Sequence, residues 1–273
     1  LSLTPLKENY ALGLRMRAGG DGLIAARCCS ALSVEYLTYL MAGGHQGDLL
    51  VGLIEEEKLC YDVTRSALPT PICTVIGENR GRTKILDKGK SQSSEDRKKY
   101  LNHIIEELVP DDITFICPAQ EDDFLALGEK VKELGSYLAV MGEGNVISSL
   151  TVLKPFLLCT TASDLYAAKA PVENIARLVK WIAEKEIDVL IYNDGNNIRC
   201  CTRSGCLEGM YNAYIEMSAV CAGFISGIIR GFDTKTAFCM ALAAAYAYWR
   251  SGYTELKMGI IMEEAERIRI KEV

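Results

Sequence analysis

The sequence predicts an α/β fold built around a mostly parallel β-sheet. Short runs rich in β-branched and aromatic residues alternate along the chain with longer amphipathic segments. The short runs are apolar on both faces, which is typical of strands in a sheet that helices cover on both sides. The predicted strands are residues 34–40, 113–117, 137–141 and 188–193, and the predicted helices are residues 22–32, 47–58, 93–108, 121–134 and 172–186.

One region departs from this alternation. Residues 71–90 read as two alternating strands joined by the turn sequence NRG at 79–81. Together with a strand within residues 8–17, they predict a small antiparallel sheet outside the main one.

The C-terminal third is predicted to be all helix. Asp233 is placed to cap the N-terminus of a helix that continues to Trp249, and Gly252 is placed to end it. Both signals are local, because each needs only the residues of a single helix end.

The composition, with 49% apolar residues, suits a globular protein, and the length fits one large α/β domain or two small ones. The formal net charge of −6 argues against a broad surface for nucleic acid or for an anionic membrane. Charged residues interrupt the longest apolar stretches, so no transmembrane helix is expected, and no signal peptide is visible.

The eleven cysteines lie mostly in apolar stretches and form no CxxC motif, and neither His45 nor His103 lies near a cysteine cluster. This pattern predicts buried, reduced thiols in a cytoplasmic protein, and no metal site.

Six short motifs follow one another over nearly the whole chain: TPLKENY (4–10), GGDGLIAAR (19–27), AGGHQG (42–47), GENRGRTKI (77–85), LKPF (153–156) and AVCAGFISGIIRG (219–231). Their order resembles that of the ribokinase-like carbohydrate kinases of the phosphofructokinase B family, and most closely the branch of 1-phosphofructokinase and tagatose-6-phosphate kinase. The resemblance implies a single domain over residues 1–273, with a three-layer fold and a β-sheet lid. It also implies ATP and Mg²⁺ as cofactors and a sugar phosphate as acceptor.

The family's catalytic signature is altered in this chain. The resemblance implies Gly-Ala-Gly-Asp before the last motif, where backbone N–H groups hold the transferring phosphate and the aspartate takes the sugar proton. The residues at these positions are Ile215, Glu216, Met217 and Ser218. A serine is no general base at neutral pH, and Glu216 brings negative charge to a phosphate position. We therefore predict that Ser218 is a helix N-cap.

The resemblance implies a sugar pocket with further candidates: Gly20, Asp21, Gly43, Gly44, His45 and the lid arginine Arg80. Asp21 stands where the family usually has a lysine, which inverts the charge. As alternatives, Asp21 fits a helix start favoured by the helix dipole, His45 an ordinary loop histidine, and Arg80 a solvated hairpin arginine.

On the nucleotide side, Asp194 and Gly195 stand where the resemblance implies a glycine pattern, and they also fit a simple turn between two strands. Phe156 and Cys159 replace an asparagine and an acid that the family places near magnesium-bound phosphate.

Three functions remain open from the sequence. The first is an active kinase that phosphorylates a hexose phosphate. The second, which the several losses favour, is a pseudokinase that binds a sugar phosphate or a nucleotide as a binding or regulatory module. The third is a different enzyme on the same scaffold. The resemblance also implies a homodimer through the lid, whose exposed strand ICTVI would benefit from cover.

Overall fold

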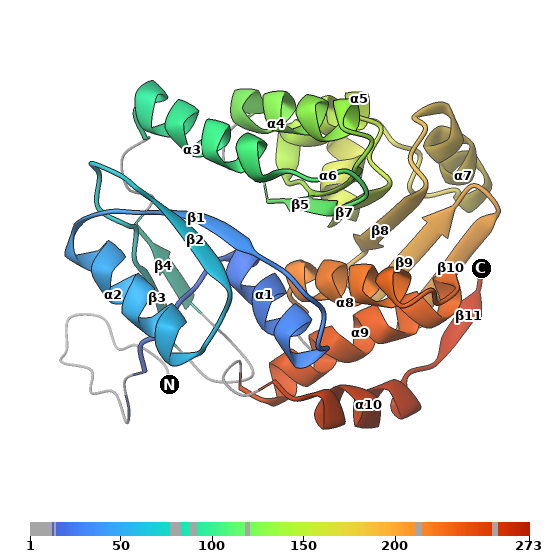
Figure 1. Ribbon diagram of the computed structural model, residues 1–273. Coiled ribbons are helices and arrows are strands. Elements are labelled where there is room, and N and C mark those ends of the chain that lie inside the picture. Colours follow the sequence, from blue (N-terminus) through green and yellow to red (C-terminus); the bar gives the residue numbers. More distant parts are fainter. Residues whose placement is uncertain are drawn as a thin grey trace, which may run out of the picture.

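The computed structural model of the chain describes residues 13, 15–76, 83–87, 92–117, 121–210, 215–252 and 256–273. A seven-stranded sheet forms the middle layer, in the spatial order β11-β10-β9-β8-β7-β6-β5 (Figure 1). Its strands are β5 (Ile113–Ile116), β6 (Tyr137–Met141), β7 (Leu157–Thr161), β8 (Val189–Asn193), β9 (Asn197–Thr202), β10 (Gly205–Met210) and β11 (Ile270–Glu272).

The sheet has a parallel half and an antiparallel half. Neighbours from β5 to β8 pair in parallel, as the doubly apolar strand runs predict. Neighbours from β8 to β11 pair antiparallel, joined by tight turns and by the return of the C-terminus. The α/β class is thus confirmed, with a sheet that is mixed beyond β8.

A second, separate sheet contains only β1 (Thr38–Ala42) and β2 (Tyr61–Arg65), which pair in parallel. The helix α2 (Gly44–Glu56) connects these two strands. The strand predicted at residues 34–40 is therefore present but begins four residues later.

Helices cover both faces of the large sheet (Figure 1). On one face lie α3 and α4, and on the other α1, α8, α9 and α10. The helix bounds are α1 (Asp21–Ala31), α3 (Ser94–Glu107), α4 (Glu121–Glu133), α5 (Ile147–Val152), α6 (Ala162–Ala167), α7 (Ile175–Glu184), α8 (Met217–Ile229), α9 (Thr234–Arg250) and α10 (Met258–Arg267). The five helices predicted before residue 190 all form, within a few residues of their expected bounds.

The helix α8 is the centre of the core. Residues 218–227 of α8 are all buried, as expected for a helix that is apolar all round. Two of its glycines are needed for packing: a Cβ on Gly223 would lie 2.8 Å from the Cα of Ala241, and one on Gly227 would lie 2.7 Å from the Cα of Ala237. The small residues therefore let α8 and α9 approach closely.

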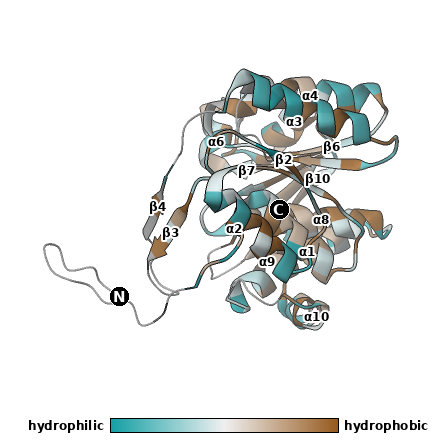
Figure 2. Ribbon diagram, turned by 60° about the vertical axis from the view of Figure 1, so that its left-hand side comes forward, coloured by the Kyte–Doolittle hydropathy of each residue, from teal (hydrophilic) through white to brown (hydrophobic). Residues whose placement is uncertain are grey.

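The lid is a two-stranded antiparallel sheet of β3 (Cys73–Ile76) and β4 (Thr83–Leu86), which confirms the prediction for residues 71–90 within the described residues. Figure 2 shows both strands standing apart from the body of the molecule. The additional lid strand expected within residues 8–17 is not seen at 13 and 15–17, and the rest of that range lies outside the described residues.

Two expectations about the C-terminal third can be compared with the structure. It is not all helical, because β9, β10 and β11 lie within it. The predicted helix start at Asp233 is confirmed, since its Oδ1 accepts a hydrogen bond from the N–H of Thr236 at 2.7 Å.

The prediction of uniformly reduced cysteines is wrong for one pair. Cys201 and Cys206 occupy directly paired positions of β9 and β10 and form a disulfide. The other nine cysteines are free. Within the described part of the chain, no helix is both long enough and apolar enough to span a membrane.

Candidate functional site

Two helix N-termini meet at the site that the sequence singles out. The helix α1 begins at Asp21 after Gly20, whose φ of 112° suits glycine, and α8 begins at Met217 after Glu216. The Ser218 hydroxyl donates a hydrogen bond to Oδ1 of Asp21 at 3.1 Å. Two family positions that lie 197 residues apart in the sequence are therefore in direct contact.

The N-cap role predicted for Ser218 is wrong. Glu216 occupies the cap position, and Ser218 is the second residue of the helix with its side chain fully buried. Because its hydroxyl points to Asp21 on a neighbouring helix, it satisfies a tertiary contact instead of the N–H groups of its own first turn.

A cleft of about 2510 Å³ opens at these helix ends. Its lining includes Gly20, Asp21 and Glu216 from the family positions, together with Phe156 and the end of β5 at Cys117. Two carboxylates thus stand at helix N-termini beside the cleft, where a phosphate would otherwise find N–H groups and positive dipoles.

Two of the thiols behind this site, Cys117 and Cys221, are neutral at pH 7. Burial raises the pKa of Cys117 and of Cys221 above the ordinary value, and the neighbouring Cys159 raises that of Cys221 further. Magnesium prefers oxygen ligands, so the sulfur of Cys159 is a poor substitute for the oxygens of an acid. Among the described residues, no group of three or more histidine, cysteine, aspartate or glutamate side chains is arranged to hold a metal ion.

The glycine turn at Gly43 and Gly44 has a structural explanation. A Cβ on Gly43 would lie 2.2 Å from the carbonyl oxygen of Leu68, and Gly44 has φ 64°. The Gly43 N–H donates to Oγ1 of Thr70 at 3.0 Å, and its carbonyl accepts from the Thr70 N–H at 2.9 Å. Thr70, which the sequence does not single out, lines the cleft.

The remaining sugar-side candidates lie apart from these contacts. His45 is exposed in the first turn of α2, and neither it nor the two glycines belong to the described lining of the cleft. Arg80 lies outside the described residues. Arg97, from α3, does line the cleft, and no motif of the sequence points to it.

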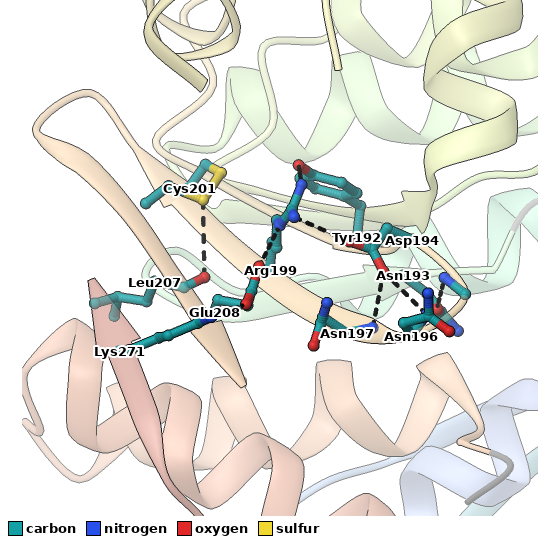
Figure 3. A network of polar contacts seen from close by, with 12 residues as sticks. Tyr192, Asn193, Asp194, Asn196, Asn197, Arg199, Cys201, Leu207, Glu208 and Lys271 are labelled. Atoms are coloured by element: carbon teal, nitrogen blue, oxygen red, sulfur yellow. Dashed lines mark hydrogen bonds and ion pairs between the residues drawn. A yellow bond between two sulfur atoms is a disulfide. The ribbon is translucent and has the colours of Figure 1, made fainter. Parts of the chain in front are cut away.

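On the nucleotide side, Asp194 and Gly195 form a tight turn between β8 and β9 (Figure 3). The Asp194 Oδ1 accepts hydrogen bonds from the N–H groups of Asn196 at 3.0 Å and Asn197 at 2.8 Å. The Gly195 N–H donates to Oδ1 of Asn193 at 2.7 Å. The interpretation as a strand-to-strand turn is confirmed, and three of its N–H groups already bond within the turn.

A charged network fixes this turn to the antiparallel half of the sheet (Figure 3). Arg199 pairs with Asp194 at 3.2 Å and with Glu208 at 2.9 Å, and Glu208 also pairs with Lys271 of β11 at 2.7 Å. Hydrogen bonds from Lys271 and Arg199 lower the pKa of the Glu208 carboxyl. The network therefore connects the turn, the hairpin and the C-terminal strand.

The sequence matches no protein-family model and no curated protein. Solved structures do match over nearly its full length. They include phosphofructokinase-2 from Escherichia coli in complex with substrates and products, with 13% identity, a TM-score of 0.84, and coverage of 97% of this chain and 92% of that one.

Two other matching structures come from different organisms. A possible 1-phosphofructokinase from Thermotoga maritima is 18% identical, with a TM-score of 0.80 and coverage of 100% of this chain and 93% of that chain. A carbohydrate kinase from Agrobacterium tumefaciens is 16% identical, with a TM-score of 0.76 and coverage of 99% and 93%. The chain therefore has the ribokinase-like α/β fold of phosphofructokinase-type carbohydrate kinases.

Proposed function

We propose that this protein is a catalytically impaired relative of the sugar-phosphate kinases and that its cleft serves as a binding or regulatory module. The observation that carries the proposal is the hydrogen bond from Ser218 to Asp21. It joins the position of the family's general base to the position of its phosphate-binding lysine, and neither residue has the chemistry that phosphoryl transfer needs there.

The charges at the helix ends oppose the phosphates of ATP. Two like unit charges about 5 Å apart repel by roughly 3 kcal/mol at an effective dielectric constant near 20. A phosphate at the start of α8 would meet Glu216, and one at the start of α1 would meet Asp21. The residues present do not fit a magnesium nucleotide, so no step through it is assigned to this chain.

A specific contact keeps a second candidate function open. Asp21 brings a carboxylate to within 3.1 Å of the hydroxyl at the family's base position. In an active hexose phosphate kinase, Asp21 would then take over the role of general base from α8, and Ser218 would orient it.

One set of assays separates the two functions. ATP consumption is measured with fructose 1-phosphate, fructose 6-phosphate and tagatose 6-phosphate, for the native protein and for Asp21→Asn. The impaired-kinase proposal expects background turnover from both. Robust turnover by the native protein that Asp21→Asn abolishes would establish the relocated base instead.

Binding is tested separately from turnover. Thermal shifts are recorded with the same sugar phosphates, with ATP and with ADP, in the presence and absence of Mg²⁺. The proposal expects ATP with Mg²⁺ to stabilise the protein no more than ATP or ADP alone, because Asp21 and Glu216 oppose nucleotide phosphates. Stabilisation that appears only with ATP and Mg²⁺ together would argue for the kinase.

The exposed apolar residues of the lid favour a second copy of the chain as a binding partner. Ile72, Val75 and Ile85 expose 53%, 47% and 54% of their surface on or beside the two lid strands. Isolated two-stranded sheets with such edges gain stability from cover by another strand pair. A homodimer through the lid would supply it.

A further inference from the structure

The disulfide of Cys201 and Cys206 lies near the closed end of the hairpin formed by β9 and β10. The two cysteines are directly paired across the strands. Only the pair of Thr202 with Gly205 and the turn at 203–204 lie beyond them. The ends of paired strands open more easily than their middle, so a small local opening gives access to this bond.

The hairpin does not depend on this bond for its register. Its two strands already pair at six positions, and β8 and β11 pair with their outer edges. A disulfide stabilises mainly by restricting the unfolded chain, and this effect is smallest when the two cysteines are close in the sequence. Cys201 and Cys206 are only five positions apart. The same hairpin can therefore form with the bond open.

The bond is also isolated among the cysteines of the chain. The other nine are free, and they include the exposed Cys60 and Cys73. Where most cysteines of a protein stay reduced, a single disulfide is usually a catalytic or redox-sensing one. The cysteine usage thus favours a pair that opens and closes over a permanent crosslink.

The surroundings of the pair suit both oxidation states. Cys201 is fully buried and Cys206 is 3% exposed, in the same apolar cluster as Leu178 and Ile182 of α7. A neutral thiol behaves as a small apolar side chain in such a cluster. The Sγ of Cys206 also lies 3.7 Å from the carbonyl oxygen of Leu207, which would accept a hydrogen bond from the thiol after reduction.

Opening the bond changes the spacing of the two strands. Reduction adds a hydrogen atom to each sulfur and removes the covalent link, so the reduced pair needs more room than the oxidised one. The helix α7 packs on β9 and β10 above the pair, and protein interiors leave little free space. The strands must therefore move apart slightly, or α7 must shift.

The next pair on the same face of the hairpin is Arg199 with Glu208. Residues two positions apart on a strand share a face, so Cys201 lies next to Arg199 on β9 (Figure 3). In the same way, Cys206 lies next to Glu208 on β10. The Arg199 Nε donates to Oε2 of Glu208 at 2.9 Å. A change of strand spacing at the cysteines reaches this ion pair first.

Arg199 passes such a change on to the turn between β8 and β9. Its Nη2 lies 3.2 Å from Oδ2 of Asp194. The other oxygen of the same carboxylate accepts hydrogen bonds from the N–H groups of Asn196 and Asn197 at 3.0 and 2.8 Å. Any movement of Arg199 therefore changes how firmly Asp194 holds the two N–H groups of the turn.

We propose that Cys201 and Cys206 form a reversible redox site and that its oxidation state sets the order of the turn at Asp194. In the oxidised state the bond holds β9 and β10 together beside the pair of Arg199 and Glu208. In the reduced state this pair is looser and the turn opens more often. The regulation does not depend on whether the cleft binds a ligand or catalyses a reaction.

The reductant is a small thiol such as glutathione. Its thiolate attacks one sulfur of the bond and forms a mixed disulfide with it, and the other cysteine leaves as a thiolate that takes up a proton. A second molecule of the small thiol attacks the mixed disulfide. The protein thereby gains two electrons and two protons, and the two small thiols leave as their own disulfide. Oxidation by that disulfide follows the same steps in reverse.

Thiol labelling tests whether the bond is reversible. The folded native protein is equilibrated at different ratios of reduced to oxidised glutathione, quenched with acid, and alkylated in denaturant. Peptide mass spectrometry then reads the label on Cys201 and Cys206. Both should become labelled as the share of reduced glutathione rises, and both should lose the label when the ratio is reversed. A bond that stays closed, or stays open, at every ratio in the folded protein would overturn the proposal.

Amide hydrogen exchange tests the link to the turn. Reduction should speed exchange at Asn196 and Asn197 by roughly threefold or more, while Leu158 of β7 keeps its rate. A response confined to Ser204, at the end of the hairpin, would show that the bond is only a local crosslink and would contradict the regulation. Unchanged exchange throughout the hairpin would contradict it as well.

Point variants separate this pair from the other thiols. Under oxidising conditions, Cys206→Ala should exchange like the reduced native protein. Cys200→Ala is the matched control, because Cys200 is a free, buried thiol next to Cys201 in sequence but on the opposite face of the sheet. It should keep the redox response of the native chain, and loss of the response in this control would assign the effect to a different thiol. If Cys206→Ala does not fold, the comparison of the two redox states of the native protein decides.

Discussion

The hydroxyl of Ser218 and the carboxylate of Asp21 form a partly buried hydrogen bond between the first turns of α8 and α1, beside the cleft. The bond stabilises the packing of the two helices. It also gives the serine hydroxyl a carboxylate as its partner, where an activated serine would have a histidine or a lysine. Ser218 is therefore best understood as a structural residue.

Ser218→Ala should lower the free energy of unfolding by about 1–2 kcal/mol, because a partly buried hydrogen bond to a charged acceptor is lost. Turnover should remain at background. Ser226→Ala is the matched control, since Ser226 is equally buried in α8 but bonds to the Ala222 carbonyl within its own helix at 2.7 Å. In chemical denaturation, Ser226→Ala should lower the free energy of unfolding by less than Ser218→Ala does. Native turnover that Ser218→Ala abolishes would contradict the structural role.

Restoring the family's signature should not restore activity. The quadruple variant places glycine at 215 and 217, alanine at 216 and aspartate at 218. The new carboxylate would stand against Asp21 at hydrogen-bond distance, where two like charges repel and one must take up a proton. Phe156 and Cys159 would also remain in place of the asparagine and the acid that the family has near magnesium-bound phosphate. ATP consumption with the three hexose phosphates should stay near background, and efficient turnover would show that the signature alone had been limiting.

Gly223→Ala and Gly227→Ala should each destabilise the protein by about 1–3 kcal/mol, because the added methyl group meets the backbone of α9. Gly259→Ala in α10 is the control. Apart from its chain neighbours and the backbone of its own helix, no described atom lies within 4 Å of the position that its methyl group would take, so alanine should be neutral or stabilising by about 0.5–1 kcal/mol. Thermal and urea unfolding would measure the difference, and equal effects at all three sites would contradict the close approach of α8 and α9.

The Glu208 network should make stability depend on acid pH. Lys271 and Arg199 lower the pKa of Glu208 in the folded state. The ionised Glu208 therefore contributes its full share to the free energy of unfolding above about pH 4.3, the pKa of glutamate in the unfolded chain. This share is lost as the pH falls through the lower pKa of the folded state. Glu208→Gln should lower the free energy of unfolding by about 1–3 kcal/mol at pH 7. The difference from the native protein should shrink below about pH 4. A difference that does not change with pH would mean that the charge of Glu208 is unimportant.

If the protein forms a dimer through the lid, a charged substitution on the lid should lower its mass in solution. Ile85→Asp places a charge on an exposed apolar surface of β4 and should convert a dimer to a monomer in light scattering at tens of micromolar. Val152→Asp, also exposed, at the end of α5, should leave the mass unchanged. A monomeric native protein would remove the lid as an interface.

The sequence predicts well where the signal is local. Asp233 caps its helix as expected, because a cap needs only the next few residues. The hairpin of β9 and β10 was missed because its strands contain cysteines, glycines and charged residues in place of a clear alternation, as in GCLEGM. The disulfide depends on this missed pairing, so it could not be anticipated either.

At the functional site the limits have a different cause. The motif order placed Asp21 and Ser218 at the same site, but their direct hydrogen bond depends on how α1 and α8 pack. The N-cap expectation for Ser218 failed because the helix begins earlier than expected, with Glu216 at the cap. The separation of β1 and β2 from the large sheet depends on long-range strand order, which periodicity does not encode.

The tight contact of α8 with α9 limits how far the walls of the cleft can move. Since Gly223 and Gly227 leave no free space between α8 and α9, the wall of the cleft that α8 forms cannot move relative to α9. The opposite wall belongs to the small sheet of β1 and β2, which packs on Leu23 and Ala26 of α1 and is also bonded to α3. Both walls of the cleft are therefore anchored in the body of the fold, so a spectroscopic distance between them should change little when a ligand binds.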